Sequence, residues 1–402
     1  MSEYQYYEFL AIDRPLTEDE IGELRELSTR ATITPTSFAN EYNWGNFKGD
    51  PEKLMQRYFD AHVYVANWMT AIFMVRLPIE ALYEETATAL AVPYLLDIKA
   101  TKTHWIITWR LEESENYDRF GMEDGRGWMA RLAPVRDELL RGDLRSLYIG
   151  WLSAVAGKMM DDGEIEPLTV SGLGSLTAAQ QALAEFLEVD PDLLAGAGMG
   201  SAAAPEEGIS RQEMDEWIDS LPRDEVNSVL QQLLEGKGQQ AERSIKNRFA
   251  AWLRGLNTDR AELSRRTVGE LRQNAGKARQ IRLDKQKRDR KQREIQRRKE
   301  REAYLKNLSN DFPKAWASVR EPVERGSGRG YDEACRALLD IAEAYALHAT
   351  QKAFQKELKE FMAGHMQRKA LIQRLVKAGI LEGSIKDEHA KPKKGKGARR
   401  IG

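Results

Sequence analysis

One long stretch of the chain, Thr267 to Leu308, constrains the fold more than any other. Its middle, Asp284 to Glu294, contains no apolar residue, so no face of this segment can be buried in a core. It is nevertheless rich in Lys, Arg, Gln and Glu, and no Gly or Pro occurs after Gly276, so we expect a single helix. Thr267 and Glu270 form a predicted capping box at its start. A helix of about 40 residues is about 60 Å long, and most of this one must face solvent.

The predicted helix is strongly basic. Between Arg272 and Glu302 there are 14 Lys or Arg and 5 Asp or Glu, a net charge of +9. Acidic residues precede basic ones by four positions in three places, which stabilises an isolated helix: Asp284/Arg288, Asp289/Arg293 and Glu294/Arg298. The pattern leaves two interpretations open, a surface that binds nucleic-acid phosphates or a solvated spacer or coiled-coil arm in a protein assembly. We prefer the first, because +9 exceeds what helix stability requires.

The candidate phosphate contacts are the basic side chains of this helix and of a predicted disordered tail at 385–402. Because the basic side chains surround the helix, we expect them to neutralise the phosphate backbone of DNA or RNA without reading bases. They are Arg282, Lys285, Lys287, Arg288, Arg290, Lys291, Arg293, Arg297, Arg298, Lys299, Lys393, Lys394, Lys396, Arg399 and Arg400.

The charge of the whole chain is polarised. Among 402 residues the formal net charge is −2, but residues 1–230 carry 19 Lys or Arg against 41 Asp or Glu, a net charge of −22. The rest of the chain carries 42 against 22, a net charge of +20. This pattern predicts an acidic half that docks a protein partner and a basic half that binds nucleic acid. The alternative is that the two halves neutralise each other within one molecule.

The cysteine and hydropathy patterns indicate the compartment. Cys335 is the only cysteine, so an intrachain disulfide and a cysteine-rich zinc site are excluded. The N-terminus has no basic region followed by an apolar run, and the chain has no apolar stretch of 18 residues. We therefore expect a cytoplasmic protein that does not associate with membranes.

The acidic half is predicted to be an α+β domain with a ferredoxin-like type of sheet and covering helices. Strands are expected at Tyr4–Ile12, Ala31–Tyr42, Ala71–Leu77 and His104–Glu112. Helices are expected between them, beginning at the Thr17/Glu20 capping box, at Asp50 with Tyr58, His62 and Val65 on its buried stripe, and at Ile79. Amphipathic helices within Met129–Met160 should cover the sheet. Exposed aromatic residues on such a sheet can stack RNA bases, but Trp105 and Trp109 fit a core better.

The remaining chain is predicted to be all α-helical around the long basic helix. The expected organisation is an acidic α+β domain at 1–168, short helices and a Gly/Ala linker at 169–208, a small helical bundle at 209–266, the long helix at 267–312, a helical hairpin at 313–384 and the tail at 385–402. The linker is centred on Gly196 to Gly208. Its glycines do not follow a strand or open a helix, so they do not predict a dinucleotide loop.

The sequence contains no recognisable catalytic motif. None of the five histidines forms an HExxH pair, and there is no GxSxG, P-loop lysine or Cys/His nucleophile pattern. Asp161, Asp162, Glu164 and Glu166 lie close together, but they are too few for a calcium loop and predict a solvated acidic loop. The sequence therefore favours a non-enzymatic protein with no cofactor and no metal.

The segment Tyr331 to Leu381 resembles a known kind of helical region. Its pattern, YDEACRALLDIAEAY followed by AFQKELKEFMAGHMQRKALIQRL and VKAGIL, with His365, Lys369 and Gly379, is similar to the C-terminal region of bacterial proteins that carry, or are encoded beside, SWIM-type zinc fingers. With Cys335 alone, the ligands of that zinc finger are absent. The resemblance implies a bacterial protein that works with nucleic-acid-associated partners.

Overall fold

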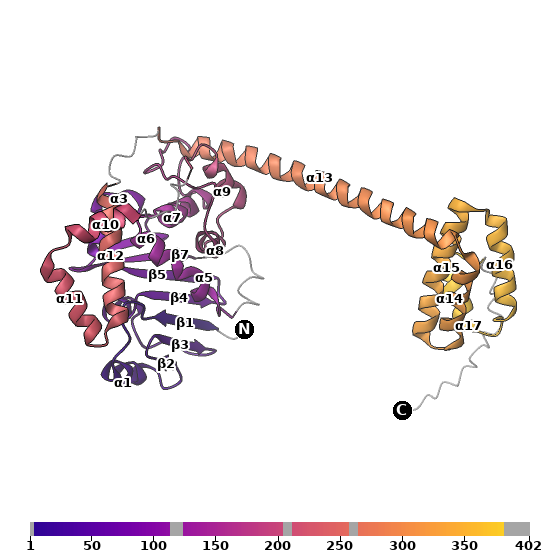
Figure 1. Ribbon diagram of the computed structural model, residues 1–402, viewed down its shortest axis with the longest axis horizontal. Coiled ribbons are helices and arrows are strands. Elements are labelled where there is room, and N and C mark those ends of the chain that lie inside the picture. Colours follow the sequence, from indigo (N-terminus) through magenta and orange to yellow (C-terminus); the bar gives the residue numbers. More distant parts are fainter. Residues whose placement is uncertain (1–3, 113–123, 204–210, 257–263, 382–402) are drawn as a thin grey trace, which may run out of the picture. The chain divides into compact units, whose positions relative to one another are not determined.

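The computed structural model describes residues 4–112, 124–203, 211–256 and 264–381 (Figure 1). It forms two compact units, Met1–Leu283 (unit 1) and Asp284–Gly402 (unit 2). Unit 1 contains an antiparallel sheet with helices, and unit 2 is helical throughout its described residues. The predicted fold class is therefore confirmed, namely an α+β N-terminal part followed by an all-helical part with one long helix.

In the described part of unit 1, seven strands form one antiparallel sheet in the order β2-β3-β1-β4-β5-β7-β6. Their bounds are β1 Gln5–Leu10, β2 Thr32–Thr34, β3 Ser37–Tyr42, β4 Ala61–Ala66, β5 Thr70–Pro78, β6 Leu96–Ala100 and β7 His104–Leu111. Helix α1 (Glu18–Leu27) joins β1 to β2, and α2 (Pro51–Arg57) joins β3 to β4. The first four strands thus have the β-α-β-β-α-β connection and the strand order of a ferredoxin-like unit. Strands β5, β7 and β6 extend it on the β4 side.

Three of the predicted elements are corrected by the structure. The helix expected from Asp50 through Val65 ends at Arg57, and the following residues form the buried strand β4. All six residues of β4 are buried, so the alternation that marks a half-buried strand is absent from its sequence. Ala31–Tyr42 is a hairpin of β2 and β3 rather than one strand, and the helix expected at Ile79–Ala91 is a short 3₁₀ turn (Ile79–Ala81) followed by α3 (Glu84–Leu90).

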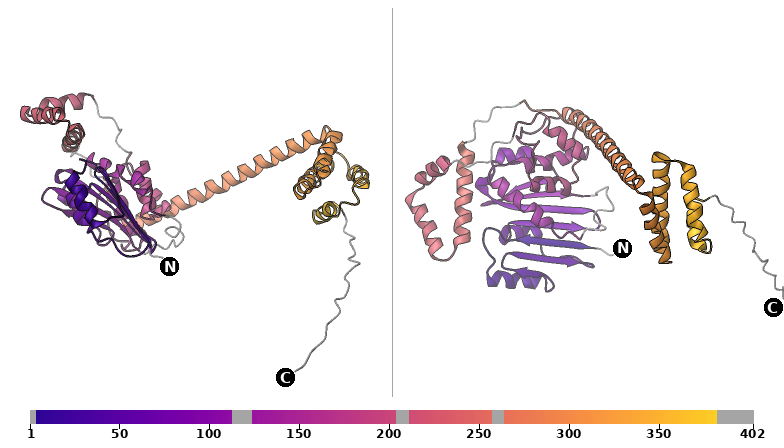
Figure 2. Two further views of the ribbon diagram at one scale, coloured as in Figure 1. Left: turned by 90° about the horizontal axis from the view of Figure 1, so that it is seen from below. Right: turned by 45° about the vertical axis from the view of Figure 1, so that its right-hand side comes forward.

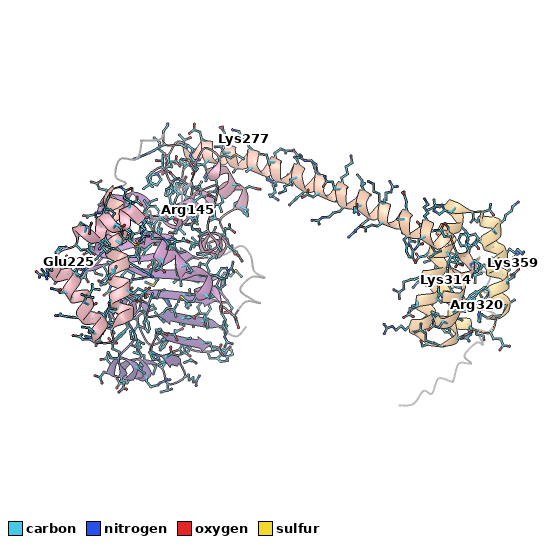
Figure 3. The ribbon with its side chains drawn as sticks, viewed as in Figure 1. Arg145, Glu225, Lys277, Lys314, Arg320 and Lys359 are labelled. Carbon is cyan, nitrogen blue, oxygen red and sulfur yellow. The ribbon has the colours of Figure 1, made fainter. Side chains whose placement is uncertain are left out.

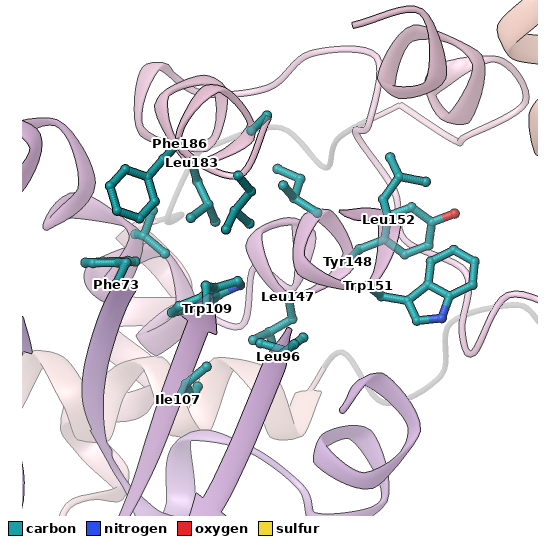
Figure 4. Close-up of a cluster of buried hydrophobic side chains, with 14 of the residues drawn as sticks. Phe73, Leu96, Ile107, Trp109, Leu147, Tyr148, Trp151, Leu152, Leu183 and Phe186 are labelled. Atoms are coloured by element: carbon teal, nitrogen blue, oxygen red, sulfur yellow. The ribbon is translucent and has the colours of Figure 1, made fainter. Parts of the chain in front are cut away.

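Each face of the sheet is covered by its own set of helices (Figure 2). Phe9, Phe38 and Tyr64 point to the face covered by α1 and α2. Val63, Phe73 and Trp109 point to the opposite face, covered by α5 (Trp128–Leu132), α6 (Pro134–Leu140), α7 (Arg145–Ala156) and α8 (Ala178–Phe186). Figure 4 shows this larger core, in which Phe73 stacks on Trp109 with a ring-centroid distance of 5.3 Å. Trp105 and Trp109 are buried, so they serve the core and not RNA stacking.

The predicted linker and the boundary at residue 168 do not separate two cores. Val170 to Ala197 contribute buried residues to the same core as the sheet. Gly196 and Gly198 close helix α9 (Pro191–Gly198), and a Cβ atom on Gly196 would lie 2.4 Å from the backbone nitrogen of Ala275. Gly196 is thus present for close packing of two helices. Residues 204–208 of the predicted linker lie outside the described residues.

Three helices complete unit 1, and a helical bundle forms most of unit 2. The helices of unit 1 are α10 (Arg211–Ser220), α11 (Arg223–Leu234) and α12 (Gly238–Leu256). Up to residue 381, where the described residues end, the predicted terminal hairpin contains four helices, α14 (Phe312–Glu324), α15 (Gly328–His348), α16 (Gln351–Ala363) and α17 (Lys369–Lys377). Trp316, Leu338, Phe361 and Leu375 are buried in its core.

His62 on β4 predicts a specific dependence of stability on pH. The ring is fully buried against Phe9, its Nδ1 lies 2.9 Å from the Glu8 carbonyl oxygen, and burial lowers the pKa of His62 to about 3. In the unfolded chain the pKa is about 6.5, so between these values only the unfolded state binds the proton. This contribution to stability is complete above pH ~6.5 and decreases at about 1.4 kcal/mol per pH unit as the pH falls toward 3.

The variant His62→Phe keeps an aromatic ring beside Phe9. As the pH falls from ~6.5 toward 3, its free energy of unfolding should therefore decrease less than that of the wild type. Urea unfolding followed by circular dichroism at several pH values measures the difference in slope. His348→Gln, which removes an exposed histidine and leaves His62 in place, is measured beside it as the control. If the free energy of unfolding depends on pH with the same slope for His62→Phe and for the wild type, His62 does not titrate in this way.

Candidate nucleic-acid interface

The long basic helix is present as one continuous element, α13 (Val268–Ser309). Its predicted capping box is formed, because the Glu270 backbone N–H donates to Thr267 Oγ1 at 3.1 Å and the Thr267 N–H donates to the Glu270 carboxylate at 2.8 Å. These bonds satisfy N–H groups that the first turn of a helix leaves free. The start of the helix is thus fixed by its own sequence.

The first turns of α13 are packed into unit 1. Val268 and Leu271 are fully buried in the larger core. Just before the helix, Arg266 forms an ion pair with the buried Glu166 at 2.9 Å and donates to the carbonyl oxygens of Ala197 and Met199. Tyr148 also donates to Glu166, at 2.7 Å. These contacts hold the N-terminal end of α13 rigidly in unit 1.

The other end of α13 is anchored within unit 2. Leu305 is fully buried. The Arg301 guanidinium donates to Asp340 at 2.6 Å and to Glu343 at 2.5 Å, both on α15. Hydrogen bonds to these two carboxylates raise the pKa of Arg301 above its usual value, so the charge of Arg301 is paired within the bundle.

Between Asp284 and Glu300 every basic side chain of α13 is exposed (Figure 3). In this segment, ion pairing of the basic residues with other described residues is limited to Lys287, whose Nζ lies 3.9 Å from Asp284. Arg288 donates to the Asp284 carbonyl oxygen at 3.4 Å. The predicted pairs Asp289/Arg293 and Glu294/Arg298 are not formed as ion pairs in this described segment. The exposed residues are Lys285, Lys287, Arg288, Arg290, Lys291, Arg293, Arg297, Arg298 and Lys299.

The net charge of this segment lies on one side of the helix. Successive residues of an α-helix are ~100° apart around its axis, so each position from 284 to 300 can be assigned to one of two halves of the helix circumference. One half, the cationic face, has six basic residues and one acidic residue, a net charge of +5, and the other, the neutral face, has three of each. The cationic face consists of Lys287, Arg290, Lys291, Arg293, Glu294, Arg297 and Arg298. The neutral face carries Asp284, Lys285, Arg288, Asp289, Lys299 and Glu300. Basic side chains thus surround the helix, but its net charge is concentrated on one face.

The cationic face has the chemistry of a phosphate-binding surface. Arg290, Arg293 and Arg297 lie within about 60° of one another and span about 10 Å of helix. A guanidinium binds two phosphate oxygens at once and cannot be deprotonated near neutral pH. These three arginines are exposed and form no ion pair with the described residues, Glu294 of the same face included, so their N–H donors face solvent. The face is therefore free to take anionic groups.

The other predicted site residues are placed differently. Arg282 forms an ion pair with Asp192 of α9 at 2.7 Å, and this hydrogen bond lowers the pKa of the Asp192 carboxyl. It therefore serves mainly to hold α13 on unit 1. Lys393, Lys394, Lys396, Arg399 and Arg400 lie outside the described residues. The sidedness of the charge was missed, although placing the residues at helical angles would have revealed it.

The acidic residues near Gly163 form ion pairs and hydrogen bonds within the chain. Asp162 forms an ion pair with Arg272 of α13, and Glu166 is buried with Arg266. Glu164 accepts the Asp161 backbone N–H at 2.6 Å. Among the described residues, no group of three or more His, Cys, Asp or Glu side chains is arranged to hold a metal ion.

A second charged cluster is buried beside the sheet. Asp60 receives the guanidinium of Arg76 at 2.7 Å, and Asp13 receives that of Arg136 at 2.6 Å. Burial opposes ionisation of both carboxyls and raises the pKa of Asp13, whereas Arg136 and Arg76 outweigh burial at Asp60 and lower its pKa. A pocket of about 360 Å³ lies next to this cluster, lined in part by Arg14, Arg57 and His104. The cluster has two carboxylates and two guanidinium groups, so its charge is balanced. Arg14 and Arg57 are themselves paired with Glu20 and Glu23.

Two further observations bear on the setting of this interface. Among the described helices, none combines the length and the apolar character needed to cross a membrane. Comparison of the chain with family models, with curated proteins and with solved structures yields no match.

Proposed function

We propose that the protein binds the phosphate backbone of nucleic acid, DNA or RNA, without reading its sequence and without catalysing a reaction. The observation that carries this proposal is the cationic face of α13, a net charge of +5 on one half of an exposed helix. Double-stranded DNA carries one negative charge per ~1.7 Å of its axis, and neutralisation of these phosphates supplies essentially all of non-specific binding. Contacts to phosphates position a protein but carry no sequence information.

The acidic N-terminal half fits a different partner. Residues 1–230 have a net charge of −22, which repels phosphates and favours a basic protein surface. We therefore propose that unit 1 docks a protein while α13 holds nucleic acid. The resemblance of Tyr331–Leu381 to SWIM-associated bacterial proteins likewise implies a bacterial protein that works with nucleic-acid-associated partners.

The rival proposal is a structural subunit that uses α13 as a spacer or a coiled-coil arm. It is supported by the continuity of α13 and by its anchored ends. A coiled-coil seam, however, needs an apolar residue at about every 3.5 positions, and from 284 to 300 the only apolar residue is Ile295. A solvated spacer needs no sidedness of charge, whereas a phosphate-binding helix does.

Charge reversal separates the two proposals. The variant Arg288→Glu/Arg293→Glu/Arg298→Glu should lose retention of DNA and RNA on nitrocellulose filters at low salt, because like charge repels phosphate. Circular dichroism of the same variant measures its helical content. If helicity falls while filter retention is unchanged, the spacer proposal is favoured. If the wild-type chain retains neither DNA nor RNA, nucleic-acid binding is excluded.

A further inference from the structure

Helix α11 exposes its apolar side to solvent. None of its residues is buried, and the exposed fractions are 37% for Val226, 52% for Leu230, 49% for Leu233 and 89% for Leu234. At ~100° per residue these four side chains fall within about 100° of one another, so they form one stripe along the helix. We call these four residues the α11 stripe. A continuous apolar stripe of this kind on a helix marks a surface for interaction.

The α11 stripe is not the surface by which the helix packs on its neighbour. The partly buried residues of α11 include Glu225, Val229 and Gln232, which lie together on a different side of the helix. Glu225, labelled in Figure 3, forms an ion pair with Arg248 of α12 at 2.9 Å. The helix is thus held on α12 through the border of its apolar side, and the centre of that side remains exposed.

The preceding helix has the same character. In α10, Trp217 is buried and packs against Phe249 of α12 with a centroid distance of 5.0 Å. Met214 and Ile218, four residues apart, are 41% and 49% exposed. Two consecutive helices therefore each keep apolar residues at helical spacing outside the core.

The charge around these residues defines the partner. Residues 211–235 carry two Arg against seven Asp or Glu, a net charge of −5. Asp215, Asp219 and Asp224 are exposed and form no ion pair with the described part of the chain. A basic partner is attracted to such a surface, whereas an anionic lipid headgroup or the same acidic surface of a second copy is repelled.

We propose that α10 and α11 form the docking surface for a basic amphipathic helix of another protein. The apolar face of the partner helix covers the α11 stripe, and its Lys or Arg residues reach Asp215, Asp219 and Asp224. In this kind of recognition, apolar residues of the partner helix at i, i+3, i+4 and i+7 serve as anchors. The inference rests on the protein-docking half of the proposed function and gives the chemistry of that partner.

The test uses a fluorescein-labelled helical peptide of leucine and lysine, about 18 residues or five turns long, added to the whole chain. Fluorescence anisotropy should show saturable binding to the wild type. The variant Leu230→Gln/Leu233→Gln/Leu234→Gln should bind at least about tenfold more weakly, since it loses three apolar anchors. These side chains are about half or more exposed, so the fold does not depend on them. The control Leu339→Gln/Leu347→Gln/Met366→Gln alters three exposed apolar residues of unit 2 and should bind like the wild type.

Each of the opposing outcomes overturns the inference. The first two are that the wild type shows no saturable binding of the peptide, or that the α11 stripe variant binds it as tightly as the wild type does. The third is that a peptide with glutamate in place of lysine binds the wild type equally well. The fourth is that sedimentation shows a dimer of the wild type that the α11 stripe variant does not form. Filter retention of DNA should be the same for the wild type and the α11 stripe variant. If nuclease-treated lysate proteins copurify equally with both, unit 1 still docks a protein but not through this surface; if no protein copurifies with either, the protein-docking half of the proposed function fails.

Discussion

Replacing Arg290, Arg293 and Arg297 together with glutamine is expected to weaken binding to duplex DNA by about two orders of magnitude at ~0.15 M salt. The three arginines occupy one stripe of the cationic face and are exposed. Each phosphate contact contributes about 0.9 to the dependence of log affinity on log salt, so three contacts contribute about 2.7. Glutamine is a good helix former and keeps the length of α13 unchanged. The loss should therefore reflect charge and not helix stability.

The same helix provides a matched control. Lys285→Gln/Arg288→Gln/Lys299→Gln removes three charges from the neutral face of the same segment. Its total charge and helix propensity match those of the first variant, yet we expect less than about tenfold loss of affinity. Titration of labelled duplex, followed by fluorescence anisotropy at fixed salt, compares the two. Equal losses would mean that only the total charge matters and that the cationic face is not a site.

The largest expected effect on stability comes from Arg136. Its side chain is fully buried, donates to the Arg76 carbonyl oxygen at 2.8 Å and pairs with Asp13. The variant Arg136→Met leaves the Asp13 and Asp60 carboxyls in a buried site with Arg76 as their remaining cation. Breaking a buried ion pair by removing one partner typically destabilises by about 3–5 kcal/mol. We expect a loss of that size in the free energy of unfolding, measured by urea denaturation at neutral pH.

Arg131→Met is the control for this experiment. Arg131 belongs to the neighbouring helix α5 and forms an ion pair with Glu185, but its side chain is 45% exposed. An exposed pair contributes about 0–1 kcal/mol. If Arg136→Met and Arg131→Met reduce stability equally, the buried cluster does not stabilise unit 1 in the way its geometry indicates.

The elements that were predicted correctly are those whose sequence signal is local. Thr17 and Glu20 identify the start of α1, Thr267 and Glu270 identify the start of α13, and both capping boxes are formed. Between Asp284 and Glu294 the absence of apolar residues was enough to predict exposure. In these cases the chain within a few residues determines the structure.

The elements that were missed depend on contacts that are distant in sequence. Strand β4 lies between β1 and β5, and its two faces are buried in the two cores under the covering helices, which its own sequence does not show. The sequence predicts a linker at Gly196, because the packing role of this residue depends on Ala275, 79 positions away in the chain. The pairing of Arg136 with Asp13 likewise exists only after the sheet has brought the two segments together.

The salt dependence of nucleic-acid binding by the wild-type chain tests the central claim most directly. With about five phosphates neutralised by the cationic face, the logarithm of the affinity for duplex DNA should fall with the logarithm of salt concentration with a slope near −4.5 between about 50 and 200 mM. A duplex of unrelated sequence should give the same slope. A slope near zero, or no binding at the lowest salt concentration, would contradict the assignment of α13 as a phosphate-binding helix.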